Sequence, residues 1–165
     1  MTDKHWVTGL GYDVHRLEAG RKLVLGGIAI PYARGLAGHS DADVIIHAVM
    51  DAMLGAAGLP NIGIQFPNDD PAYKDAQSLD LLAIVVAIMK DAGWHVGNID
   101  VTVLAEEPKL AEYRAAMISN IAGVIGDKSA AINIKATTHE GLGALGRGEG
   151  IAAMAVAQLW RETAS

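Results

Sequence analysis

Two histidines and one aspartate in the first third of the chain have the types and spacing of a divalent-metal site. Asp13 and His15 are two residues apart, so in an extended segment both side chains point to the same side. His47 lies in an apolar stretch that indicates a helix. Together the three supply one oxygen and two nitrogen donors, which leaves a fourth position open at a tetrahedral zinc ion, as in catalytic sites. A lone histidine on such a helix is more often structural, and spacing alone does not show that the three converge.

The stretch before His47 also has a structural interpretation as the start of a helix. Ser40 or Asp41 fits the N-cap position, and Asp43 follows Ser40 by three residues, as the acid of a capping box does. Asp43 and Asp51 each lie one helical turn from His47. They therefore either orient its ring or belong to a solvated helix face. A cap requires no histidine, which keeps a chemical role open for the two in this stretch.

A glycine-rich segment at residues 138–150 has the composition of an anion-binding loop. Its five glycines in thirteen residues exclude a regular element and let backbone N–H groups approach a phosphate. The segment lacks the lysine and serine of a P-loop and the spacing of a dinucleotide-binding loop. Thr137, Thr138 and Glu140 place hydroxyls beside a carboxylate, which suits phosphate oxygens and a hard cation such as Mg²⁺. The alternative is an exposed loop in which Arg147 forms only a surface ion pair.

Composition narrows the class of protein. The chain has 165 residues, which we expect to form one domain over residues 1–165. Cysteine is absent, so zinc would have to be held by imidazole and carboxylate. The net charge of -6 argues against nucleic-acid binding, and the apolar runs are too short to span a membrane. We expect a cytoplasmic enzyme or binding domain without a nucleic-acid or membrane partner.

Hydrophobic periodicity predicts a chain that alternates between strands and helices. The expected strands span residues 6–12, 99–104 and 131–137, with a hairpin at 23–30 that turns at its two glycines. The expected helices begin near Ser40, at Ser78 as the N-cap of 78–91, and at Pro108 in the first turn of 109–125. Residues 151–160 fit helix or strand equally. The connection at 60–71 is long enough to be functional, with mere mobility as the alternative.

Taken in order, these motifs resemble those of the 2-C-methyl-D-erythritol 2,4-cyclodiphosphate synthase family. The resemblance extends over nearly the whole chain, and its first and last motifs together are highly specific. The motifs are Gly11-Tyr12-Asp13-Val14-His15, Gly26-Gly27, Ile30-Pro31-Tyr32, His39-Ser40-Asp41-Ala42-Asp43 with His47, Phe66-Pro67, Pro108-Lys109, Lys135-Ala136-Thr137-Thr138 and Gly146-Arg147-Gly148-Glu149-Gly150.

The resemblance implies a fold, an assembly and a reaction. The implied fold is α+β, a compact subunit in which helices pack on one face of a mixed β-sheet, with residues 151–160 as a strand. The implied assembly is a homotrimer with active sites at the subunit interfaces. The implied reaction is the metal-dependent cyclisation of 4-diphosphocytidyl-2-C-methyl-D-erythritol 2-phosphate, which releases CMP in non-mevalonate isoprenoid synthesis. Such a reaction brings two anions together, so positioning and charge neutralisation carry the catalysis.

The resemblance also implies roles for individual residues. Zinc, or another divalent transition metal, is implied at Asp13, His15 and His47, and Mg²⁺ or Mn²⁺ at Glu140 with the substrate diphosphate. His39 and Thr138 match the residues that stabilise the transition state. The implied substrate contacts fall into groups. Those at the phosphates and metal are Asp13, His15, His39 and Ser40, and those on the erythritol side are Asn61, Ile62, Gly63, Phe66, Pro67, Asn68, Asp69 and Asp70. Those around cytidine are Ala105, Lys109, Leu110 and Ala111 with Thr137, Thr138, His139 and Glu140 of the facing subunit, and Ala144 and Arg147 are further contacts. Arg147 and Glu149 also match residues that line the trimer's central cavity, where an isoprenoid phosphate binds in some members.

The chain departs from the family's pattern at several substrate-side positions. Asn61 and Asn68 replace residues that are commonly aspartate, and an amide accepts hydrogen bonds more weakly than a carboxylate. His139 and Gly141 replace the usual threonine and lysine, and Ala144 replaces a bulky side chain. Two alternatives to the synthase therefore stay open. One is a weakly active or inactive trimer that senses isoprenoid phosphates, and the other is a simple metal-dependent phosphatase.

Overall fold

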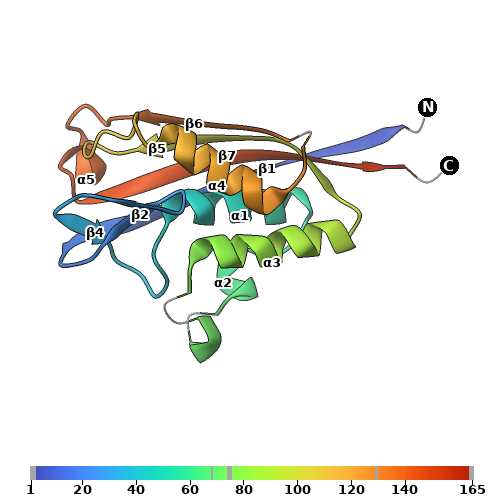
Figure 1. The fold of residues 1–165 in the computed structure, drawn as a ribbon, viewed down its shortest axis with the longest axis horizontal. Helices are drawn as coiled ribbons and strands as arrows, with labels where there is room; N and C mark the ends of the chain where they lie inside the picture. Colours follow the sequence, from blue (N-terminus) through green and yellow to red (C-terminus); the bar gives the residue numbers. More distant parts are fainter. Residues whose placement is uncertain (1–2, 68, 74–75, 129, 164–165) are drawn as a thin grey trace.

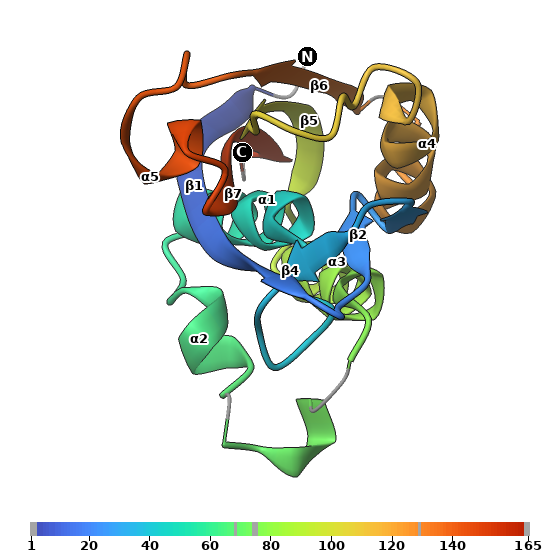
Figure 2. The same ribbon diagram turned by 90° about the vertical axis from the view of Figure 1, so that its left-hand side faces the viewer.

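A five-stranded mixed sheet with helices on one face forms the frame of the protein (Figures 1 and 2). The computed structural model describes residues 3–67, 69–73, 76–128 and 130–163. The strand order is β4-β1-β7-β5-β6, in which β5 and β6 pair in parallel and the other neighbours pair antiparallel. The first long helix packs on the centre of the sheet, and the other two long helices lie on the same side (Figure 2). The expected α+β class is confirmed.

The helices and strands have these bounds in chain order. They are β1 Lys4–Ala19, β2 Leu23–Leu25, β3 Ile28–Ile30, β4 Arg34–Leu36, α1 Val44–Ala56, α2 Ile62–Gln65, a 3-10 turn Pro71–Tyr73, α3 Ser78–Asp91, β5 His95–Leu104, α4 Arg114–Ile125, β6 Ala131–Thr137, α5 Gly143–Gly146 and β7 Gly150–Glu162. The predicted hairpin is the β2–β3 pair, and β6 has its predicted bounds. β7 confirms the strand that the resemblance implied at 151–160. The expectation that no regular element lies in residues 138–150 is wrong, because α5 forms a single helical turn there.

All three predicted helix starts are wrong in detail. The N-cap of α1 is Asp43, whose carboxylate accepts from the backbone N–H groups of Ile45 and Ile46 at 3.1 and 3.2 Å. Ser78 does not cap α3, since it is the first helical residue and its hydroxyl is bonded elsewhere. The third helix begins at Arg114 rather than near Lys109. Local propensity thus placed these helices but did not fix their first residues.

Asp43 joins the start of α1 to the turn of the hairpin. Its second carboxylate oxygen accepts from the backbone N–H of Gly27 at 2.7 Å, and the turn uses positive φ angles at Gly26 and Gly27. Asp43 is fully buried. Burial raises the pKa of Asp43 to about 6, against the opposing effect of the backbone N–H groups of Gly27 and Gly26.

The backbone of β1 approaches α1 very closely. Alternate residues of β1 face the helix. Gly9 and Gly11 are two of them, and both lie against the backbone of α1. A Cβ atom on Gly11 would lie 2.0 Å from the carbonyl oxygen of Ala48, and one on Gly9 would lie 2.2 Å from that of Ala52. Contacts this short do not occur, so only glycine fits at both positions. The next two helix-facing positions of β1 are Asp13 and His15.

The opposite face of the sheet carries exposed apolar side chains. Leu10 is 63% and Tyr12 is 52% exposed, and their partners across the β1–β7 pair, Val156 and Met154, are exposed as well. None of the three long helices covers this face (Figure 2). Monomeric soluble proteins rarely expose large contiguous apolar patches, so this face has the character of an interaction surface.

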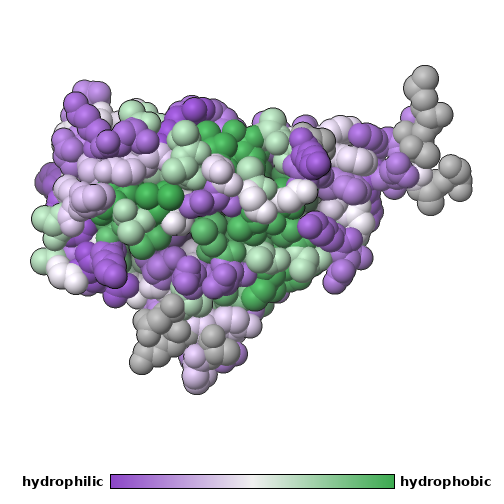
Figure 3. All heavy atoms as spheres, in the orientation of Figure 1, coloured by the Kyte–Doolittle hydropathy of each residue, from purple (hydrophilic) through white to green (hydrophobic). Residues whose placement is uncertain are grey.

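The helix side of the molecule is also partly apolar. Apolar atoms gather over α3 and α4 between polar side chains (Figure 3), and Ile84 on α3 is 43% exposed. Among the described residues, no helix combines the length and hydrophobicity needed to cross a bilayer.

We expect Gly11→Ala to lower the free energy of unfolding by about 1–3 kcal/mol, because the new methyl group would collide with the backbone of α1. Gly55→Ala is the matched control within α1, where a Cβ atom meets nothing within 4 Å. The control should raise the free energy of unfolding by about 0.5–1 kcal/mol. Urea unfolding of both variants tests this, and a Gly11→Ala protein as stable as the wild type would contradict the close contact.

A second prediction concerns the pH dependence of stability. The pKa of Asp43 is about 6 in the folded protein and 3.8 for the ordinary carboxyl, so the folded state retains a proton that the unfolded chain releases. The stabilisation that this proton on Asp43 contributes is fully present below pH 3.8 and is lost as the pH rises through about 6. Asp43→Asn cannot titrate, so the stability of the wild type relative to this variant should fall by about 2 kcal/mol between pH 4 and pH 7. Urea unfolding across that range measures the difference, and a constant difference would contradict the prediction.

Candidate metal and substrate site

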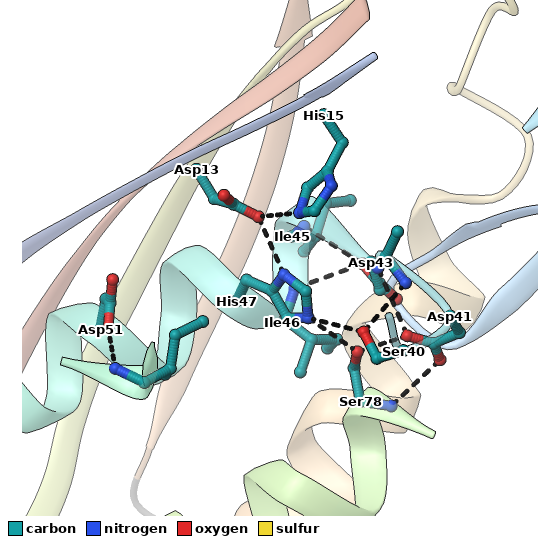
Figure 4. A network of polar contacts seen from close by, with 12 residues as sticks. Asp13, His15, Ser40, Asp41, Asp43, Ile45, Ile46, His47, Asp51 and Ser78 are labelled. Carbon is teal, nitrogen blue, oxygen red and sulfur yellow. Dashed lines mark hydrogen bonds and ion pairs between the residues drawn. The ribbon is translucent and has the colours of Figure 1, made fainter. Parts of the chain in front are cut away.

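Asp13, His15 and His47 converge at one end of the contact between β1 and α1 (Figure 4). The Oδ2 atom of Asp13 lies 3.0 Å from Nε2 of His15 and 2.9 Å from Nδ1 of His47. One donor atom from each residue lies within 4.8 Å of the other two. The structure therefore brings together the three residues that the sequence singled out.

The three side chains influence one another's protonation. Burial acts to raise the pKa of Asp13, but the hydrogen bonds and charges of His15 and His47 outweigh it and hold the pKa well below its usual range. Burial likewise disfavours a charged His15, whereas the bond and charge of Asp13 prevail and raise the pKa of that ring. A divalent cation requires the same ionised carboxylate and imidazole nitrogens without protons. It would therefore replace protons at this site.

Each imidazole is oriented through its second ring nitrogen. The Nδ1–H of His15 donates to the carbonyl oxygen of Ala37, which turns Nε2 toward Asp13. The Nε2 atom of His47 lies 3.1 Å from Oγ of Ser78 and 3.3 Å from Oγ of Ser40. The site offers one carboxylate oxygen and two imidazole nitrogens, and each ring is held by a hydrogen bond at its other nitrogen. These donor types and orientations fit a zinc ion.

Asp43 and Asp51, each one helical turn from His47, do not hydrogen-bond its ring. Asp43 caps α1, and Asp51 accepts from the backbone N–H of Ile62 at 2.8 Å. The possibility that Asp43 or Asp51 supports His47 is therefore wrong. Asp51 instead attaches the start of α2 to α1, which places Ile62 beside the three converging side chains.

A cavity of about 260 Å³ opens beside the three residues. Most of the phosphate-side and erythritol-side residues expected from the sequence line it, together with Tyr73, which carried no sequence signal. Its lining includes Asp13, His15, His39, Ser40, His47, Ile62, Gly63, Phe66 and Tyr73. The ring of Tyr73 meets that of Phe66 edge-on, with the ring centroids 5.2 Å apart.

Other described residues expected at the erythritol side lie near α2 but do not line this cavity. Asn61 caps α2, and its side-chain oxygen accepts from the backbone N–H of Ile64 at 3.3 Å. Pro67, Asp69 and Asp70 follow α2 and are not among the residues that line this cavity. Asn68 lies outside the described residues.

A second cavity, of about 480 Å³, lies between the segment after β5 and the end of β6. Most of the residues expected around cytidine line it, namely Ala105, Lys109, Leu110, Ala111, Thr137 and Thr138, and both groups do so within one chain. His139 and Glu140 are not among its lining residues. Arg114 also lines it, and its Nε atom donates to the carbonyl oxygen of Ile134 at 2.6 Å. The two cavities share no lining residue.

The loop after β6 is held by a carboxylate that sequence reasoning did not assign a role. Glu106 accepts from the backbone N–H of His139 at 2.7 Å and from that of Gly141 at 3.4 Å. Within the loop, the hydroxyl of Thr138 donates to the carboxylate of Glu140 at 3.0 Å. The expected magnesium ligand Glu140 is therefore beside the second cavity, and it lines neither cavity.

The remaining expected residues lie on the surface. Ala144 is exposed on α5. Arg147 is exposed and donates from Nε to Glu149 at 2.6 Å. Within the described chain, Arg147 thus forms the surface ion pair that was the alternative to an anion site.

Comparison with known proteins places these features in a family context. Residues 6–160 match the YgbB family. A curated protein of Geotalea daltonii named 2-C-methyl-D-erythritol 2,4-cyclodiphosphate synthase is 56% identical over 153 residues, which is 93% of this chain and 90% of the relative. The structure of the Plasmodium falciparum IspF CDP complex matches with a TM-score of 0.83 at 31% identity, over 96% of this chain and 97% of that one. The bifunctional IspDF of Campylobacter jejuni matches with a TM-score of 0.91 at 42% identity, over 96% of this chain and 43% of that one.

Proposed function

The chain belongs to the YgbB family, and we propose that it converts 4-diphosphocytidyl-2-C-methyl-D-erythritol 2-phosphate to 2-C-methyl-D-erythritol 2,4-cyclodiphosphate and CMP. It is thus a phosphorus–oxygen lyase of isoprenoid precursor synthesis, like the relatives named for this activity. The observation that carries the proposal is the convergence of Asp13, His15 and His47 at the wall of a cavity.

The reaction requires positioning more than a protein nucleophile. An oxygen of the substrate's own 2-phosphate attacks the β-phosphorus, and the bond from that phosphorus to the oxygen of the CMP phosphate breaks with its electron pair. Because the attacking and leaving groups belong to one molecule, the protein must fold the substrate and neutralise its phosphates. This requirement explains a site made of hydrogen-bond donors and cation ligands.

His39 and Ser40 are suited to hold the attacking phosphate. Both line the cavity beside the converging residues. The Oγ atom of Ser40 accepts from the backbone N–H of Ala42 at 3.1 Å and lies 3.3 Å from Nε2 of His47, and when that nitrogen carries the ring hydrogen the hydroxyl of Ser40 is able to donate to a phosphate oxygen. The imidazole of His39 is a second donor on the same wall.

Two cations complete the proposed site. We assign zinc, or another divalent transition metal, to Asp13, His15 and His47, since their donor types fit it. When bound, it would supply positive charge to a substrate phosphate. We assign Mg²⁺ or Mn²⁺ to Glu140, whose carboxylate suits a hard cation shared with the diphosphate.

The second cavity is the proposed cytidine site. Lys109 supplies positive charge there in a protein of net charge -6. The relative from Plasmodium falciparum was solved as a CDP complex, which supports a cytidine nucleotide as part of the substrate. Thr138, which also lines this cavity, is the proposed second residue that stabilises the transition state.

We further propose a homotrimer in which the first cavity of one subunit meets the second cavity of its neighbour. Two observations support it: the two cavities share no lining residue, and the outer face of β1 and β7 exposes apolar side chains. Arg147 and Glu149 would then lie toward a central cavity that admits an isoprenoid phosphate. The complete set of proposed zinc ligands favours catalysis over the alternative of an inactive sensor.

Incubation of the purified protein with the diphosphocytidyl substrate, Zn²⁺ and Mg²⁺ should release CMP and cyclic diphosphate in equal amounts, as followed by chromatography. His47→Ala should lose bound zinc and slow CMP release by about 100-fold or more. His95→Ala is the matched control, since this ring is 52% exposed and lines neither cavity of the site. Release of inorganic phosphate would indicate a phosphatase, and wild-type CMP release by metal-free His47→Ala would contradict the proposal.

Sedimentation equilibrium should give a mass of about three times the 17.2 kDa of one chain. Leu10→Asp places a charge on the exposed apolar face of the sheet and should produce monomers, because an unpaired charge is costly at a buried interface. Ile84→Asp, on α3, is the matched control and should remain trimeric. A monomeric wild type, or a trimeric Leu10→Asp variant, would overturn the proposed assembly.

A further inference from the structure

A chain of hydrogen bonds runs from the ring of His47 through Ser78 to Asp41 (Figure 4). Ser78 is fully buried, and its Oγ atom lies 3.1 Å from Nε2 of His47. The same Oγ atom also bonds Oδ1 of Asp41. Ser78 is the first residue of α3, a segment distant from His47 in sequence. It contacts the ring nitrogen of His47 that faces away from Asp13.

The direction of these bonds follows from the groups involved. A carboxylate only accepts hydrogen bonds, so the single hydrogen of the Ser78 hydroxyl goes to Asp41. The lone pairs of the Ser78 oxygen then face His47, and the bond between them requires a hydrogen on Nε2. A neutral imidazole that carries its hydrogen on Nε2 has a bare Nδ1. The bare nitrogen is the one that faces Asp13.

We propose that Ser78 and Asp41 are positioning residues that select the Nε2–H form of His47 and so present Nδ1 to the metal ion. The proposal rests on the zinc site of the proposed function and assigns two residues that support it from behind. Bonds of this kind fix the tautomer of a ligating histidine and raise its basicity.

Asp41 is held in place for this role. Its Oδ2 atom accepts from the backbone N–H of Ser78 at 3.0 Å, and Oδ1 also accepts from the backbone N–H of Asp43 at 3.3 Å. In addition, the backbone N–H of Asp41 donates to the carbonyl oxygen of Ala76 at 3.3 Å. The carboxylate therefore cannot turn away from the Ser78 hydroxyl without loss of backbone bonds.

Ser40 does not provide the same selection. Its Oγ atom is farther from Nε2 of His47, at 3.3 Å, and it accepts from the backbone N–H of Ala42. Its hydrogen bonds within the described chain include no carboxylate, so its hydroxyl is able to donate to Nε2 and favour the opposite tautomer. Ser78 differs from Ser40 because its one hydroxyl hydrogen is donated to the carboxylate of Asp41.

Ser78→Ala separates this role from a purely structural one. The variant removes the hydroxyl but retains the backbone bond from residue 78 to Asp41, which joins α3 to the start of α1. Competition with a chromophoric chelator should show zinc affinity reduced by about 10- to 100-fold. Ser78→Thr keeps a hydroxyl and should remain within about threefold of the wild type, whereas Ser40→Ala should lose less affinity than Ser78→Ala.

Proton and ¹⁵N NMR of the zinc-loaded proteins supplies a readout that does not depend on activity. The Nε2–H of His47 should give a slowly exchanging ring-proton signal in the wild type, and in Ser78→Ala that signal should shift and exchange faster. Wild-type zinc affinity together with an unchanged ring-proton signal in Ser78→Ala would overturn the proposal. A wild-type protein that binds no zinc would instead overturn the metal assignment itself, and the positioning role with it.

Discussion

The contact between the backbone of β1 and that of α1 is the constraint on which the site depends. Gly9 and Gly11 leave no room for a side chain against the helix, so the helix rests directly on the strand. The same face of β1 continues to Asp13, which thereby comes within 2.9 Å of His47 on the helix. A wider spacing between strand and helix would separate the two residues and leave no common position for a cation.

Three aspartates then assemble the rest of the site around α1. Asp43 accepts from the hairpin turn at Gly27, Asp41 from the start of α3, and Asp51 from the start of α2. Each of them receives a backbone N–H from a different segment, and such charge-assisted bonds are stronger than neutral ones. The cavity walls are therefore attached to the same helix that supplies His47. The acidic stretch with Asp41 and Asp43, which resembles a simple helix cap, thus joins three segments, and Asp51 attaches a fourth.

The sequence predicted the parts of this arrangement that local periodicity determines. The two-residue spacing of Asp13 and His15 placed both on one face, and the strand at 131–137 had its observed bounds. The pattern of residues 151–160 left helix and strand open, because alanine favours a helix locally while pairing with β1 and β5 decides for a strand. The roles of Ser78 and Glu106 depend on partners more than thirty residues away, so no local signal revealed them.

Anomalous diffraction at the zinc edge, from crystals of the zinc-loaded protein, tests the assignment of the metal ligands. We expect one strong peak per chain, bonded to Oδ2 of Asp13, Nε2 of His15 and Nδ1 of His47 at about 2.0–2.2 Å. The ring of His47 should keep Nε2 turned toward Ser78. A metal bound elsewhere, or one that contacts His47 through Nε2, would contradict both the metal site and the role of Ser78.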